Sequence, residues 1–362
     1  MKLPTYDELA AVEEQLQVLE HPLDESLFVA GPPGSGKTVL AVQRAQMLAG
    51  ESTPLVTYSR MLRRLFKLVG DQSVVPWTMH RFVWHDFQQR TQRNPAEYQS
   101  DSFQHDWSAM LEYLRQNSTD NRHSHIVIDE GQDLPKGFFQ YIRLYATEVM
   151  TVFADDDQAI GERATTLEEI KEAADMDDPI VLDQNHRNTP QIAQLAEHFH
   201  SGRLPAATVR RPPGDLPRLL HCAGSTATAR RISEWFRNRG GSIGVIVNRN
   251  TTGSGIRAAL GHQLPEGTRL DFYDSQSKND ETINILEPGV TILNKESVKG
   301  QEFDTVFILE LECFLPCANN VERRAMYMMR ARARDHLFLV YDSNLGPVAR
   351  AALPGSDILE AS

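Results

Sequence analysis

A glycine-rich segment near the N-terminus has the residue types that bind nucleotide phosphates. The sequence GPPGSGKT occupies residues 31–38 and fits the pattern G-x-x-x-x-G-K-[ST]. It follows the apolar run LFVA and precedes the helix-like run TVLAVQRAQML. In such a loop the glycines let backbone N–H groups turn toward phosphate oxygens, and the helix N-terminus adds its positive end. The loop residues that we expect to contact the nucleotide are Gly31, Gly34, Ser35 and Gly36.

Four further side chains complete a predicted site for ATP and Mg²⁺. Lys37 is expected to reach the β- and γ-phosphates, and the Thr38 hydroxyl to bind the metal ion. The apolar run HIVI ends in Asp129 and Glu130, at the kind of strand end where open α/β sheets bind ligands. Asp129 would hold Mg²⁺ through water, and Glu130 would polarise the attacking water. These roles favour nucleotide hydrolysis, because a small-molecule kinase needs no separate water activator.

Short apolar runs alternate with longer amphipathic stretches around these residues. The runs are apolar on both faces and rich in Val, Ile and Phe, as parallel strands covered by helices must be. The alternation predicts a doubly wound α/β fold. Strands are expected at 26–31, 54–59, 125–130, 149–155, 244–248, 289–294, 305–311 and 336–342. Helices are expected at 37–49, 60–69, 190–200 and 225–238. The two groups of four strands predict two domains, 1–177 and 178–362.

Composition limits the class of protein. The chain has 362 residues and a formal net charge of -12. Its first residues are polar and acidic, unlike a secretory signal, and no apolar run reaches the roughly 18 residues that span a bilayer. Three cysteines indicate neither a disulfide framework nor a zinc site, so we expect a cytoplasmic protein. The acidic net charge alone argues against nucleic-acid binding. Binding depends on the local electrostatic field, however, and not on the total charge. Basic residues cluster in SRMLRRLFKLVG and VERRAMYMMRARARD.

The order and spacing of several motifs resemble the UvrD/Rep-type superfamily 1 helicases from residue 12 to about residue 342. The matching segments are VEEQLQVLE, PLVTYSRMLRRL, WTMHRFVWHDF, IDEGQDLP, FADDDQAI, LDQNHRNTPQI, ESVKGQEFDTVFI and RRAMYMMRARARDHLFLVY. The last is similar to the family pattern RRLLYVALTRARDRLYL. The resemblance implies two RecA-like domains, 1A and 2A, with parallel sheets and the nucleotide site in the cleft between them. It also implies an ATP hydrolase that acts on single-stranded DNA.

The resemblance assigns nucleotide contacts beyond the glycine-rich loop. Gln15 would read the adenine, and His186 would lie beside it. Gln158 and Arg187 would sense the γ-phosphate, and Arg332 would be the second arginine finger. The remaining nucleotide contacts that it implies are Gly300 and Glu302.

The resemblance also implies contacts with a nucleic-acid strand. Tyr58 occupies the position of an aromatic residue that stacks on a base, and Arg60 follows it in the same motif. Thr78 and His80 correspond to contacts with the strand backbone, as does Ser297 in the second half. Single-stranded RNA is not excluded, because phosphate contacts are alike for both polymers.

The chain departs from the family pattern in the residues that hold the strand. Glu162 and Arg163 occupy the region of a stacking aromatic, which removes a contact worth roughly 1–3 kcal/mol per base. Glu296 replaces a histidine, and Ala331 replaces a threonine. The insertions are short, at about 85–122 and 250–287, and the polar segment 85–122 looks irregular, as does the Pro- and Gly-rich segment 201–220.

Two functions remain in competition at this point. The first is an ATP-dependent single-stranded DNA translocase or helicase, with 3′–5′ polarity by resemblance. The second is an ATPase switch gated by nucleic acid or by a protein partner that supplies the missing domains, in a repair or phage-defence complex. A small-molecule P-loop enzyme is a poor third, because it leaves Gln158, Arg187 and Arg332 unexplained.

Overall fold

The computed structural model describes residues 6–48, 53–70, 74–98, 101–117, 122–155, 165–201, 206–273 and 282–361, with the side chains of 98 and 101–103 left out. The chain forms two compact units. The N-terminal unit comprises Leu3–Pro32 and Gly36–Leu182, and the C-terminal unit comprises Asp183–Ser362 together with Pro33–Ser35. The division falls just after Leu182, a few residues beyond residue 178, where the sequence places the boundary.

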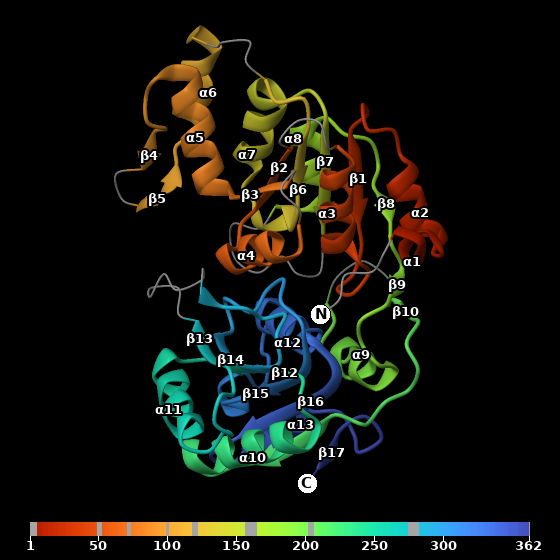
Figure 1. The fold of residues 1–362 in the computed structure, drawn as a ribbon, viewed down its shortest axis with the longest axis vertical. Coiled ribbons are helices and arrows are strands. Elements are labelled where there is room, and N and C mark those ends of the chain that lie inside the picture. The colour runs from red at the N-terminus through yellow and green to blue at the C-terminus, as the bar shows by residue number, and fades with distance from the viewer. Residues whose placement is uncertain are drawn as a thin grey trace. The chain divides into compact units, whose positions relative to one another are not determined.

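A six-stranded parallel sheet forms the centre of the N-terminal unit (Figure 1). The strand order is β3-β2-β6-β7-β1-β8, and every ladder in it is parallel. The strands are β1 (Leu27–Ala30), β2 (Thr53–Thr57), β3 (Val74–Thr78), β6 (Ile126–Ile128), β7 (Met150–Ala154) and β8 (Ile180–Val181). β1, β2, β6 and β7 are buried along their whole length, as the continuous apolar runs predict.

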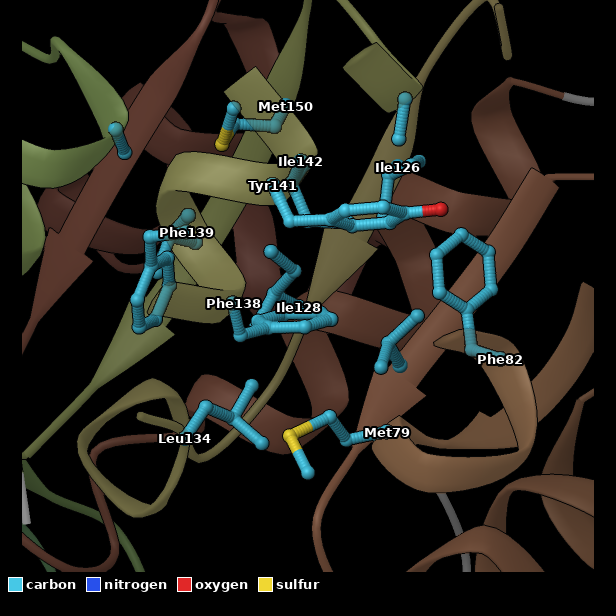
Figure 2. Close-up of a cluster of buried hydrophobic side chains, with 14 of the residues drawn as sticks. Met79, Phe82, Ile126, Ile128, Leu134, Phe138, Phe139, Tyr141, Ile142 and Met150 are labelled. Carbon is cyan, nitrogen blue, oxygen red and sulfur yellow. The ribbon is translucent and has the colours of Figure 1, made fainter. Parts of the chain in front are cut away.

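Helices accompany this sheet along the chain. They are α1 (Tyr6–Ala10), α2 (Glu13–Glu20), α3 (Lys37–Met47), α4 (Arg60–Val69), α5 (Met79–Thr91), α6 (Trp107–Asn117), α7 (Lys136–Tyr141) and α8 (Leu167–Ala174), with the short turns η1 (Gly131–Asp133) and η2 (Ile142–Ala146). Figure 2 shows part of the core that they bury, where the rings of Phe82, Phe138 and Tyr141 gather over the β6 side chains Ile126 and Ile128. This core fixes the ends of β1 and β6, which carry the predicted phosphate and metal residues.

The segment 85–122 is more regular than its composition indicates. It contains the rest of α5, a hairpin of β4 (Glu97–Tyr98) and β5 (Asp101–His105), and α6. Met110 and Leu114, four residues apart on α6, are fully buried in the core, and Trp107 packs edge-on against Phe138. The few apolar residues are thus spaced for a helix face. The expectation of an irregular insertion here is wrong.

A seven-stranded parallel sheet forms the C-terminal unit, in the order β13-β14-β12-β15-β16-β11-β17. Its strands are β11 (Arg218–His221), β12 (Ser242–Val247), β13 (Leu270–Tyr273), β14 (Gly289–Asn294), β15 (Phe303–Ile308), β16 (Ala333–Tyr341) and β17 (Glu360–Ala361). Its helices are α9 (Pro190–Glu197), α10 (Gly224–Arg239), α11 (Asn250–Gly261), α12 (Asn320–Arg330) and α13 (Pro347–Ala351), with the turn η5 (Leu311–Cys313). The rings of Phe307 and Phe338 stack in its core with centroids 4.4 Å apart.

The remaining short elements lie at the start of the C-terminal unit. β9 (Gln184–Asn185) pairs with β10 (Thr208–Val209), which is the one strand in the described part of 201–217. The described part of 250–287 contributes α11 and β13 to the same unit. Two parallel sheets with interspersed helices confirm the predicted α/β class. No helix in the described ranges has the length and apolarity needed to cross a bilayer.

Candidate nucleotide site

The glycine-rich loop connects the end of β1 to the start of α3. Gly36 is the N-cap of α3 and has a left-handed φ of 94°, which glycine adopts without strain. A Cβ at Gly36 would lie 2.8 Å from Nε2 of Gln15, so this buried side chain packs directly against the loop. The predicted adenine contact from α2 therefore lies beside the predicted phosphate loop.

Lys37 is buried at the first position of α3. Its ammonium donates to the carbonyl oxygens of Gly31 at 2.5 Å and Pro32 at 2.9 Å, and to Oδ2 of Asp155 at 3.2 Å. Asp155 follows β7 and is fully buried. The positive charge is thus held inside the loop that the sequence assigns to phosphate, and Asp155 is a partner that sequence reasoning missed.

Thr38 and Asp129 meet as the metal prediction requires. The Thr38 hydroxyl donates to Oδ2 of Asp129 at 2.9 Å. Asp129 is only 1% exposed, and its Oδ1 has no hydrogen-bond partner among the described residues. Burial, with the charge of Glu130 next to it, raises the pKa of Asp129 to about 7. A buried carboxylate oxygen without a donor is costly, and a cation bound there would satisfy it.

These residues fit Mg²⁺ as the cation. In the described part of the chain no three His, Cys, Asp or Glu side chains gather into a metal cluster. Mg²⁺ suits such a site, because it keeps several waters and binds through one or two carboxylates plus substrate phosphates. Thr38 and Asp129 would hold it, and its charge would stabilise the phosphate oxygens.

Glu130 is positioned by a residue to which the sequence assigned no role. Its backbone is left-handed, with φ 56°, and its side chain is 6% exposed. Nε2 of the fully buried Gln132 donates to Oε2 of Glu130 at 2.6 Å, and Oε1 of Gln132 accepts from the backbone N–H of Asp155 at 2.9 Å. Gln132 therefore ties the predicted water activator to the end of β7. Gln158 lies outside the described residues.

The C-terminal unit brings the two predicted arginine fingers together. Nε of Arg187 donates to Oε2 of Glu302 at 2.6 Å, and its Nη1 to the Ala331 carbonyl at 3.4 Å. Arg332, the next residue, is 1% exposed, and its Nε donates to the Met328 carbonyl at 2.9 Å. The predicted nucleotide contact Glu302 and the predicted finger Arg187 thus form an ion pair.

Asparagine and arginine side chains build this arrangement. Nδ2 of the buried Asn188 donates to the carbonyls of Ala331 and Ala333, on either side of Arg332. Nη1 of Arg211 donates to the Arg187 carbonyl at 2.9 Å and to the Arg334 carbonyl at 3.1 Å. These side chains join the segments after β9 and β10 to the end of α12 and the start of β16. Their role depends on tertiary contacts, and only the position of Asn188, one residue after Arg187 in the quoted motif, could have suggested it.

The other predicted nucleotide contacts are dispersed within this unit. Gly34 has a left-handed φ of 84°, and its carbonyl accepts from the His186 N–H at 2.9 Å. Ser35 is fully buried. Burial lowers the pKa of the His186 imidazole, whose Nε2 has no partner in the described part of the chain. Gly300, with φ 73°, lies just before β15.

The predicted strand contacts divide between the two units. Tyr58 follows β2 and is 50% exposed, and its ring centroid lies 6.1 Å from that of His80. Arg60 begins α4, and Thr78 is the N-cap of α5. Ser297 lies in the C-terminal unit, where its N–H donates to the Asn294 carbonyl after β14. The structure therefore gathers four of the five around the ends of β2 and β3.

Comparison with known proteins finds a family match for the part of the chain that contains the glycine-rich loop. Residues 23–154 match a family model described as an AAA domain. This part of the chain is a P-loop ATPase domain. The match includes Lys37, Thr38, Asp129 and Glu130, and it ends one residue before Asp155. A search of curated proteins finds no match.

Two solved structures are among those to which the chain is similar. The C-terminal domain of a possible DNA helicase from Lactobacillus plantarum WCFS1 is 20% identical, with a TM-score of 0.36, and the alignment covers 49% of this chain and 98% of that one. An arterivirus nonstructural protein 10, a helicase, is 12% identical with a TM-score of 0.41, over 94% of this chain and 65% of that one. At such identities and TM-scores neither structure defines a substrate for this chain.

Proposed function

We propose that the chain is an ATP-dependent translocase or helicase that moves along single-stranded DNA. The observation that supports the proposal is how the predicted catalytic residues are divided between the two units. The phosphate and metal residues Lys37, Thr38, Asp129 and Glu130 belong to the N-terminal unit, whereas Arg187 and Arg332 are held together in the C-terminal unit. An ATPase with its arginines on a second unit can couple hydrolysis to movement of that unit.

The contacts within the N-terminal unit suggest how hydrolysis begins. Lys37 would exchange its carbonyl partners, Gly31 and Pro32, for phosphate oxygens, which are stronger acceptors because they are charged. Glu130, held by Gln132, would orient and deprotonate the attacking water. Because phosphoryl transfer needs little covalent chemistry from the protein, this positioning supplies much of the catalysis.

The arginine ion pair supplies the coupling step. In the proposed cycle Arg187 and Arg332 stabilise the negative charge that develops on the transferring phosphoryl group. Arg187 must then leave Glu302 or share its guanidinium with the γ-phosphate, since its Nε now donates to that carboxylate. Phosphate release would restore the Arg187–Glu302 pair, and each turnover would switch the C-terminal unit between two states. The 3′–5′ polarity rests on the family resemblance.

A partner-gated ATPase switch is the second candidate. The observation that favours it is the small size of the inserted segments. The described part of 85–122 forms a hairpin and helical segments packed on the core, and that of 250–287 contributes α11 and β13 to the C-terminal sheet unit. Neither forms a separate accessory domain, so unwinding of a duplex would need a protein that supplies one.

Steady-state ATPase assays with and without polymer test the proposal. Rates are measured with single-stranded DNA, with single-stranded RNA and without polymer, at low and moderate salt. Strong stimulation by one polymer, weakening as salt rises, is expected, because the strand binds through its phosphates. Displacement of streptavidin from either end of a biotinylated strand then gives the polarity. An ATPase rate that neither polymer changes contradicts the translocase proposal and favours the partner-gated switch.

A further inference from the structure

The outward side of α5 presents an aromatic residue flanked by basic ones. Trp84 is 43% exposed, and Arg81 and His85 beside it are also exposed. Trp77, at the end of β3, supports them: its ring centroid lies 5.1 Å from that of His85, and the Arg81 guanidinium lies 5.6 Å from it. We call Arg81, Trp84 and His85 the α5 outer face. None of these residues has a role in the nucleotide site.

The buried side of α5 fixes this face in place. Asp86 is 3% exposed and accepts hydrogen bonds from Nε and Nη2 of Arg90, at 2.7 and 2.9 Å. It also binds Nε2 of His123 at 3.0 Å and the Tyr141 hydroxyl. Burial would raise the pKa of Asp86, but these hydrogen bonds and the Arg90 charge lower it to about 2. Trp84 is therefore carried by a helix anchored through a buried ion pair.

Trp84 continues a row of rings that begins at the exposed Tyr58 and passes through the half-buried His80. The Tyr58 and His80 rings are 6.1 Å apart, and His80 lies on the first turn of α5. Trp84 follows His80 by four residues, so the two side chains are neighbours on one face of the helix. Their separation along the helix axis is about 6 Å, from a rise of 1.5 Å per residue. Tyr58, just after β2, thus neighbours His80, which in turn neighbours Trp84 on α5.

The surrounding segment has the opposite charge to the rest of the chain. Residues 58–93 have a net charge of +5, whereas the whole chain has -12. The basic residues of this segment that are exposed or half-buried are Arg60, Arg64, Lys67, Arg81 and Arg93, whereas Arg63 and Arg90 are buried. α4 carries Arg60, Arg64 and Lys67, and both α4 and α5 pack against β3. A concentrated positive field of this kind attracts a polyanion.

We infer that the α5 outer face binds a single strand, with a base stacked on Trp84 and phosphates near Arg81. Aromatic rings on a basic surface are the means by which proteins hold single strands without reading their sequence. A protein partner would also cover an exposed tryptophan, but the positive field around this one favours a nucleic acid. The inference rests on the proposed function, and it extends the strand contact from Tyr58 and His80 to a residue outside the predicted set.

Equilibrium binding to two strands of the same length tests the inference. One strand is an oligothymidylate, and the other is an abasic strand that has the phosphates but no bases. Trp84→Ala is expected to weaken binding of the oligothymidylate by about 5- to 150-fold, from the usual contribution of one stacked base, and to leave binding of the abasic strand unchanged. Trp84→Phe retains a ring and should lose much less affinity. Leu144→Ala is the control, because it truncates a similarly exposed apolar side chain of the same unit.

The outcomes separate the inference from the proposed function. If the wild-type protein binds the oligothymidylate and is stimulated by it, but Trp84→Ala binds equally well, the inference alone is wrong and the face is assigned to a partner protein. If Trp84→Ala weakens both strands equally, stacking on Trp84 is excluded. If the wild-type protein binds neither strand and its ATPase ignores both, the inference and the proposed function fall together. Thermal melting of each variant checks that it is folded.

Discussion

Arg330 is a buried charge whose removal should stabilise the protein. It is the last residue of α12 and is fully buried, and Nε, Nη1 and Nη2 have no hydrogen-bond partner among the described residues. Its guanidinium carbon lies 3.7 Å from the centroid of the Phe199 ring. We therefore expect Arg330→Met, which keeps the length of the side chain, to raise the free energy of unfolding.

The magnitude follows from the pKa and the contacts. Burial lowers the pKa of Arg330 to about 9, well below that of a free guanidinium, which corresponds to a cost of about 5 kcal/mol at neutral pH. The Phe199 ring returns about 2 kcal/mol through a desolvated cation–π contact, and the C-terminal end of α12 about 1 kcal/mol. The net gain for Arg330→Met is thus about 2 kcal/mol. For a unit of this size that raises the melting temperature by about 4 to 8 °C.

Melting at two pH values gives the assay. The folded pKa lies below the unfolded one, so the cost of Arg330 is complete at neutral pH and decreases as pH rises through the folded pKa toward the unfolded value. The stability difference between Arg330→Met and wild type should therefore be largest at pH 7 and smaller in strongly alkaline melts. Arg230→Met, at an exposed position of α10, is the control and should change little. Equal or lower stability of Arg330→Met at pH 7 would refute the reasoning, because it would mean that other interactions of the guanidinium offset the whole cost of burying its charge.

Three further changes test the site and its surroundings. Glu130→Gln should bind ATP but lose turnover, as nucleotide-binding and ATPase assays would show; substantial hydrolysis would remove Glu130 from the role of water activator. Arg332→Ala should lower kcat by about 10³-fold or more with little change in ATP affinity, and an unchanged rate would place the finger elsewhere. His105, 5% exposed, has its pKa lowered to about 4 by burial and by His80. Because this is below the unfolded value, wild type should lose about 3 kcal/mol of stability as pH falls from 6.5 to 4, and His105→Phe should lose less in acid melts; equal losses would contradict that account.

The sequence predicted the sheets and the phosphate loop better than it predicted the contacts between loops. Residues 27–30 and 126–128 are recognisable because a strand buried on both faces must be apolar throughout. The spacing within GPPGSGKT is equally informative, since the backbone of the loop itself builds the site. In contrast, the α6 helix was missed because Met110 and Leu114 are its only fully buried residues, within a polar stretch.

The supporting residues of the site could not be predicted for a different reason. Gln132 and Asn188 are polar residues whose neighbours in sequence give no sign of their partners. Gln132 acquires its role because β6 and β7 are adjacent in the sheet, which places the Asp155 N–H opposite its side chain. Asn188 binds carbonyls more than a hundred residues away. Such long-range hydrogen bonds follow from the topology, and a motif records only that a polar residue is present.

The buried polar atoms without partners divide into two kinds. Asp129 Oδ1 lies in a setting of Thr38, Lys37 and the phosphate loop, where a cation and a nucleotide would complete its coordination. The Arg330 guanidinium faces an aromatic ring instead, and its pKa responds mainly to burial. The first is the kind of local violation that marks a functional site, because a ligand satisfies it. The described residues around the Arg330 guanidinium indicate no ligand that would satisfy it. Burial of its charge therefore lowers the stability of the fold. Removing the Arg330 charge therefore tests stability, whereas changing Asp129 would test the reaction.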